Sequence, residues 1–139
     1  EKALQKFPKL KFFGHSQVFW SEISDDDAPR GGYPKGKVVE TGAITRLMRK
    51  YPNLYGDLSA GSGCNALARD EEHAVKFLTE FQDRLFFGTD CCNSETECQF
   101  RGKLWFDKMH DSGKLPTEVW KKICRNNAIK FFNLDLELA

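Results

Sequence analysis

The chain has 139 residues, of which 40% are hydrophobic and 29% are charged, and its formal net charge at pH 7 is +1. This length predicts a single domain, and the near-neutral charge gives no bulk basic signal for nucleic acid. No apolar run approaches the roughly 20 residues of a membrane span, so a membrane is not an expected partner. Aromatic residues make up 13% of the chain, which indicates a densely packed interior or a surface that another surface covers.

The cysteines bear on the location of the protein. Their number, five, is odd, and Cys91 and Cys92 are adjacent. This pattern is not typical of a disulfide framework, and it favours a reducing cytoplasm. The spacing of Cys91, Cys92 and Cys98 matches no usual C-x2-C pairing of a zinc knuckle. We interpret them as buried or incidental thiols.

The first predicted strand, Leu10–Gly14, follows a helix tail over 1–7 and is followed directly by His15. In parallel sheets, chemistry gathers at the carboxyl ends of the strands, so we expect His15 to face a site. Residues 17–23 are expected to form a short helical turn. Residues 24–37 are rich in Gly and Pro, which predicts a loop that covers an active site or reaches between subunits.

The second predicted strand, Asn53–Ser59, comes after a predicted helix over 42–51. It places Asp57 and Ser59 near its carboxyl end. The next residues, Ala60–Gly63, predict a glycine-rich loop that brings backbone N–H groups close to an anion, or else a tight turn into the following helix. The segment lacks the lysine and the spacing of a phosphate-binding loop.

The third predicted strand, Arg84–Phe87, is a short apolar run that ends at Gly88. Such runs, rich in aromatics and bounded by turn residues, are typical of buried strands. A helix over 71–81, with Asp70 as its N-cap, is expected to precede it. Asp90 would then lie at the carboxyl end of the strand, either as a chemical group or as a turn-capping residue.

The remainder of the chain is predicted to be helical. After a polar loop, one helix is expected from about Gln99 to His110, and a last helix begins at Pro116. The pair Asn126 and Asn127 is expected to break that last helix in two. Three strand–helix units in series predict an α/β fold with parallel strands and right-handed crossovers. Three strands do not close a barrel, so the sheet is expected to belong to a larger structure.

Four segments occur here in the order expected of a known family: FPKLKFFGH, YPNLYGDLSAGSG, DRLFFGTD and NNAIKFFNLD. Over about Lys6 to Leu134, the chain resembles the amidohydrolase-related TIM-barrel family. That family holds metal-dependent hydrolases and decarboxylases, including the aminocarboxymuconate semialdehyde decarboxylase type. The resemblance implies that residues 1–139 form one incomplete domain, the C-terminal portion of a (β/α)8 TIM barrel with about three strand–helix units.

The resemblance also implies roles for individual residues. Asp90 resembles the metal-binding or water-activating aspartate at the end of the eighth strand, where a carboxylate can bind the ion or accept a proton. His15 resembles the histidine at the end of the sixth strand that faces the substrate or the metal-bound water. Asp57 and Ser59 correspond to the seventh strand, where they contact substrate or brace the barrel end. The implied cofactor is a divalent metal, zinc first, in the complete parent protein.

The family's first-strand H-x-H pair and fifth-strand histidine do not occur in this sequence. Because a catalytic zinc usually has three protein ligands, we do not expect this chain alone to bind the metal tightly or to turn over substrate. The leading hypothesis is a fragment of a metal-dependent hydrolase that acts on a C–N or C–O bond of a small molecule.

The alternatives are a metal-dependent decarboxylase of the same family, a non-catalytic interaction module that pairs through an open sheet edge, and an independent flavodoxin-like domain. The last is disfavoured because no glycine-rich phosphate loop follows the first strand. The expected partners are a small-molecule substrate and either a second copy of the chain or the missing part of the barrel.

Overall fold

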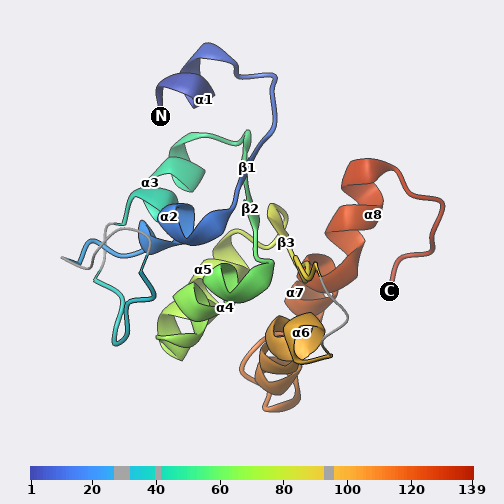
Figure 1. Ribbon diagram of the computed structural model, residues 1–139. Coiled ribbons are helices and arrows are strands. Elements are labelled where there is room, and N and C mark those ends of the chain that lie inside the picture. Colours follow the sequence, from blue (N-terminus) through green and yellow to red (C-terminus); the bar gives the residue numbers. More distant parts are fainter. Residues whose placement is uncertain (27–31, 40–41, 93–95) are drawn as a thin grey trace.

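The computed structural model describes residues 1–26, 32–39, 42–92 and 96–139, except for the side chains of 96–101 (Figure 1). Short strands alternate with helices as predicted, and one further helix, Ala60–Ala68, lies between the second and third strands where only a loop or a tight turn was expected. The elements are α1 (Lys2–Lys6), β1 (Phe12–Gly14), α2 (Ser16–Ser21), α3 (Ala43–Lys50), β2 (Leu54–Asp57), α4 (Ala60–Ala68), α5 (Glu71–Glu80), β3 (Leu85–Phe86), α6 (Thr96–Asp111), α7 (Thr117–Lys121), the π-helical turn η1 (Lys122–Asn126) and α8 (Asn127–Phe132).

The three strands form one parallel sheet, as predicted, and their order in the sheet is β1–β2–β3. The register places Phe13 beside Tyr55 and Asp57 beside Phe86. Side chains alternate between the two faces of a strand, so these four residues share one face. His15, two residues after Phe13, continues the same alternation. This parallel arrangement is consistent with three consecutive units of a (β/α)8 barrel.

The opposite face of the sheet packs against helices and forms the core. Leu54 and Leu85 are buried there, and Trp20 of α2 lies in the same cluster with 1% of its surface exposed. Full burial of a leucine side chain such as these contributes about 1.5–3 kcal/mol to the free energy of folding. The largest fully buried side chains are Trp20, Phe106, Ile23, Ile44, Met48, Leu58, Leu67, Leu78, Leu85, Met109, Leu115 and Ile123.

Helix α8 covers the face that carries the strand aromatics. The ring centroid of Phe131 lies 5.2 Å from that of Phe13 and 5.1 Å from that of Tyr55. It also lies 5.5 Å from the ring of Phe86. In Figure 1, α8 stands on one side of the strands and helices α2–α5 stand on the other. The sheet is therefore covered on both faces, as is usual for parallel strands.

The outer edge of β3 is occupied by the C-terminal helices. The backbone N–H of Phe87 donates to the carbonyl of Ile123 at 3.0 Å. The side-chain amide of Asn127 donates to the carbonyl of Leu85 at 2.8 Å. Backbone groups of this edge are therefore paired within the chain, which reduces the tendency of an edge strand to pair elsewhere.

The π-helical turn η1 explains how the helix reaches this edge. In an α-helix, the N–H of Asn127 would bond to the carbonyl of Ile123, four residues earlier. Here it bonds to the carbonyl of Lys122, and the Ile123 carbonyl accepts the N–H of Phe87. The predicted interruption near Asn126 and Asn127 takes the form of this turn, with no loop between α7 and α8.

The segment Ala60–Gly63 is the first turn of α4, so the predicted glycine-rich loop is wrong. The turn into the helix is confined to Ala60, which has a φ of 58°. A Cβ on Gly63 would lie 2.7 Å from the Cα of Leu58. Glycine is therefore needed because α4 packs directly against the backbone that follows β2.

The described parts of the predicted loop over 24–37 are tied to the end of α4. Residues 27–31 of this prediction lie outside the described part of the chain. The guanidinium of Arg69 contacts the carboxylate of Asp26 at 2.7 Å and donates to the carbonyl of Gly36 at 2.8 Å. A role of this loop as an active-site cover or an arm between subunits stays a prediction.

Helix α6 is the longest element, with 16 residues, and begins at Thr96, three residues before the predicted start at Gln99. In the described ranges, no helix has the length and apolar character needed to cross a membrane.

Candidate functional site

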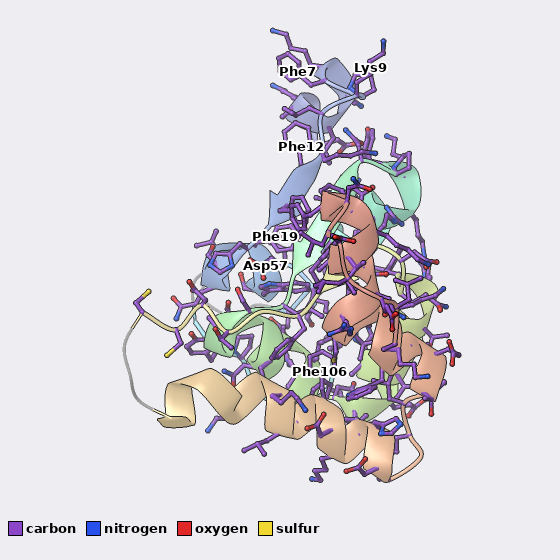
Figure 2. The ribbon with its side chains drawn as sticks, turned by 90° about the vertical axis from the view of Figure 1, so that its right-hand side faces the viewer. Phe7, Lys9, Phe12, Phe19, Asp57 and Phe106 are labelled. Carbon is purple, nitrogen blue, oxygen red and sulfur yellow. The ribbon has the colours of Figure 1, made fainter. Side chains whose placement is uncertain are left out.

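Three predicted site residues meet at the carboxyl ends of neighbouring strands. His15 directly follows β1, Asp57 ends β2, and Asp90 follows β3 by four residues. The Nδ1 atom of His15 lies 3.1 Å from Oδ2 of Asp57, and its Nε2 atom lies 3.5 Å from Oδ2 of Asp90. Figure 2 labels Asp57 at this end of the strand, beside the start of α2. The parallel sheet thus brings the imidazole between two carboxylates.

Asp57 is held from both its side chain and its backbone. The backbone N–H of Ser59 donates to Oδ1 of Asp57 at 2.9 Å. The indole N–H of Trp20 donates to the backbone carbonyl of Asp57 at 2.8 Å. The hydroxyl of Ser59 lies 3.3 Å from Nδ1 of His15, and Ser59 is 4% exposed. Asp57 and Ser59 are therefore held in place by hydrogen bonds and contact the Nδ1 side of the imidazole.

Unusual backbone conformations cluster at this site. Among the described non-glycine residues, four have a positive φ, and three of them are Ser16 (83°), Ala60 (58°) and Asp90 (50°). Each such residue costs roughly 1–3 kcal/mol, and such residues often accompany functional sites. The N–H of Ala60 also donates to the carbonyl of Thr89 at 3.2 Å. These turns hold the segments after β2 and β3 together and direct the side chains toward one another.

The site is open to solvent. The exposed fractions of the side chains are 39% for His15, 33% for Asp57 and 47% for Asp90. At such exposure, ion-pair contacts add little to stability. The same exposure leaves the imidazole and the Asp90 carboxylate accessible to a substrate or an ion.

An aromatic layer lies beneath the site on the same face of the sheet. Phe13 and Tyr55 come two residues before His15 and Asp57, and their ring centroids are 5.3 Å apart. The ring of Phe86 lies 5.2 Å from that of Phe13 and 6.0 Å from that of Tyr55. The two-residue spacing to the site residues is visible in the sequence, so this apolar floor could have been predicted.

Trp20 is the site-supporting residue that the sequence does not reveal. It belongs to the aromatic segment after His15, which predicted only a short helical turn. The hydrogen bond to the Asp57 carbonyl joins residues 37 positions apart. No local pattern indicates such a contact, because it depends on how α2 packs under the sheet.

The donor set fits a divalent metal only in part. Among the residues that the structure describes, no group of three or more His, Cys, Asp or Glu side chains converges closely enough to hold an ion. The 3.5 Å between Nε2 of His15 and Oδ2 of Asp90 is close to the separation of about 3.3 Å between two ligands in a tetrahedral zinc site. The described chain therefore offers two donors, while a catalytic zinc usually has three protein ligands.

The cysteines do not complete this set. Cys92 is exposed and its sulfur lies 3.9 Å from the carbonyl of Asp90, while Cys91 is half-buried. Burial raises the pKa of the Cys124 thiol to about 12, with the nearby carboxylate of Asp107 acting in the same direction. The side chain of Cys98 lies outside the description.

The comparison with protein families places this site in context. The amidohydrolase family matches residues 1–134, which include all three strands and the whole His15–Asp57–Asp90 cluster. No curated protein and no solved structure matches the chain. Because the family match spans almost the entire sequence, this chain belongs to the amidohydrolase family.

Proposed function

We propose that the chain is part of a metal-dependent hydrolase that cleaves a C–N or C–O bond of a small molecule. The observation that carries the proposal is the convergence of His15, Asp57 and Asp90 at the carboxyl edge of a parallel sheet, in a member of the amidohydrolase family. Family membership supports a hydrolase- or decarboxylase-type activity. The bond that is cleaved and the need for a metal are part of the proposal.

In this proposal, Asp90 is a ligand of the ion and a proton acceptor. A bound divalent metal would supply a Lewis acid and lower the pKa of a water molecule. His15 presents Nε2 on the open side of the site, where it can accept a proton from, or donate one to, a substrate. Asp57 and Ser59 were expected either to contact substrate or to brace the barrel end. Their contacts with His15 and each other support the bracing role.

The remaining ligands must come from outside this set of residues. We propose that they come from the part of the barrel that precedes this chain, as the absence of the H-x-H pair from the sequence suggests. Zinc is the proposed ion, and a cytoplasmic location remains a prediction. This chain alone is expected to bind zinc weakly and to be inactive.

A zinc titration followed by NMR tests the metal site. In the wild-type chain, added zinc should shift the backbone signals around Asp90 and His15 first. Asp90→Asn should abolish these shifts, while Asp83→Asn, which changes a carboxylate on a side chain that is 72% exposed, should leave them unchanged. Zinc-induced shifts of the same size in the Asp90→Asn variant would contradict the assignment of Asp90 as a zinc ligand.

The reaction type is tested on the complete parent protein loaded with zinc. Hydrolysis of an amide, ester or lactone yields a carboxylic acid and the amine or alcohol from the other side of the cleaved bond, without carbon dioxide. The decarboxylase alternative releases carbon dioxide from a carboxylic acid. If neither product forms across both substrate classes, the enzymatic proposal fails.

One structural feature favours the alternative of an interaction module. In the described sheet, β1 pairs with β2 alone, so its other edge faces outward. Phe7, Leu10 and Val18, on the segments that flank β1, are exposed. Figure 2 shows Phe7 at the opposite end of the molecule from Phe106. An open edge with exposed apolar side chains is suited to pairing with another chain.

This surface predicts that the isolated chain self-associates at tens of micromolar. Leu10→Lys should shift it toward the monomer, because a lysine opposes burial beside the strand. Leu104→Lys, an equivalent change at an exposed leucine on α6, should not. Size-exclusion chromatography with light scattering measures the mass. A monomeric wild-type chain would count against the module.

A further inference from the structure

We propose that Asp57 is a positioning residue that keeps the neutral His15 imidazole in the tautomer protonated on Nδ1. In this state the unprotonated Nε2 faces Asp90 and the open side of the site. The inference rests on the proposed function, because it assigns the form in which His15 meets a substrate.

The distances around the ring favour this tautomer. A neutral imidazole has one protonated nitrogen and one acceptor nitrogen. The contact between Nδ1 and Oδ2 of Asp57 is 3.1 Å, and the contact between Nε2 and Oδ2 of Asp90 is 3.5 Å. The nearer negative charge therefore lies on the Nδ1 side of the ring and favours a proton on that nitrogen.

Asp57 is also the better anchored of the two carboxylates. The N–H of Ser59 fixes Oδ1, and Trp20 fixes the backbone carbonyl of the same residue. Asp90 lies on a segment after β3, and its side chain is 47% exposed. The Ser59 hydroxyl, 3.3 Å from Nδ1, can accept from a protonated Nδ1 or donate to an unprotonated one, so the charge of Asp57 decides between the two tautomers. We therefore expect Asp57, and not Asp90, to determine which nitrogen of the His15 ring carries the proton.

This tautomer defines what the open side of the site accepts. With the proton on Nδ1, Nε2 and Oδ2 of Asp90 are two acceptors facing each other at 3.5 Å. Two lone pairs at this distance repel unless a proton donor or a cation lies beside both. The pair is therefore suited to a hydroxyl, a water molecule or a divalent ion, and it disfavours a ligand that offers only acceptors.

The hydrogen bond from Ser59 makes a sharp prediction for Asp57→Asn. The Ser59 N–H needs an acceptor, so the amide oxygen of the asparagine would turn toward it. The amide NH₂ would then face Nδ1 of His15, which must become an acceptor. The variant should therefore move the proton to Nε2, inverting the tautomer.

Two-dimensional ¹H–¹⁵N NMR of the His15 ring, with its signals assigned apart from those of the other two histidines, measures the tautomer directly. Protonated and unprotonated ring nitrogens have distinct ¹⁵N shifts. The metal-free chain is examined at alkaline pH, where the ring nitrogen shifts themselves report that the imidazole is neutral. The wild-type chain and Asp83→Asn should both show protonated Nδ1, and Asp57→Asn should show protonated Nε2. Backbone spectra of the same samples report whether each variant is folded.

Two outcomes would overturn the proposal. One is a wild-type chain with the proton on Nε2, which needs no variant. The other is a folded Asp57→Asn variant that keeps the proton on Nδ1. Neither outcome depends on zinc binding or turnover, so a failure here is distinct from a failure of the proposed hydrolase function.

Discussion

The guanidinium of Arg84 donates to the carbonyl of Met48 at 2.8 Å. A second nitrogen of the same group reaches the carbonyls of Tyr51 at 3.0 Å and Leu54 at 3.3 Å. Met48 lies near the C-terminal end of α3 and Leu54 begins β2, so one side chain ties helix to sheet. Burial lowers the pKa of Arg84, but an arginine remains charged, and its charge suits the C-terminal end of a helix.

Arg84→Met should lower the free energy of unfolding by about 2–4 kcal/mol, because it leaves these carbonyls without their charged donor. Urea denaturation measures the loss. Arg49→Met removes an exposed pair with Glu80 and should cost about 0–1 kcal/mol. Equal losses in the two variants would show that Arg84 is only another surface charge.

Gly63→Ala should destabilise the chain, although the same change elsewhere in a helix usually stabilises it by about 1 kcal/mol. The new Cβ would lie 2.7 Å from the Cα of Leu58, and backbone cannot move aside cheaply. We expect a loss of about 1–3 kcal/mol. Gly102→Ala in α6 is the matched control, because its Cβ meets only the end of the Phe87 ring at 3.3 Å. Thermal unfolding of both variants gives the sign, and a more stable Gly63→Ala variant would contradict the close contact.

The candidate site and the sheet were accessible from the sequence because both follow from short apolar runs that end in turn residues. Apolar runs that end at Gly14 and Gly88 mark two strand ends, and a parallel sheet brings such ends to one edge. The contacts of His15 with Asp57 and Asp90 follow from that rule. The catalytic and metal-binding roles of these residues stay predictions, as does the single incomplete domain.

Other features could not be predicted because they depend on contacts between distant residues. Glycine is compatible with both a loop and close packing, so Gly63 alone does not reveal that α4 has already begun. The exact form of the interruption near Asn127 depends on the bond from Phe87 to Ile123, which lies far away in sequence. Local patterns indicate where such a helix is interrupted, but they do not reveal whether the interruption is a loop or a π-helical turn with one extra residue.

Asp70 should give the chain a pH-dependent stability. Burial alone would raise its pKa, but the backbone N–H groups of Val38 and His73 donate to the carboxylate and hold its pKa below the ordinary 3.8. Because the pKa in the folded state lies below that of the unfolded state, the carboxylate stabilises the fold above about pH 4. That stability is lost as the pH falls through the folded-state pKa.

Asp70→Asn should therefore be less stable than the wild-type chain at pH 7, and the difference should shrink as the pH falls below about 4. Urea denaturation of both proteins across this range gives the two curves. Parallel curves would mean that the charge of Asp70 contributes nothing beyond its N-cap hydrogen bond to His73.

The π-helical turn Lys122–Asn126 also sets the rotational phase of everything that follows it. One residue in an α-helix corresponds to about 100° of rotation. Removing one residue from this turn would let α7 and α8 join as a continuous α-helix, and it would rotate α8 by that angle. Phe131 would then leave the aromatic face of the sheet, and Asn127 would lose the carbonyl of Leu85. The extra residue in this turn thus sets the rotation of α8 so that Asn127 can bind the edge strand while Phe131 packs on the aromatic face of the same sheet.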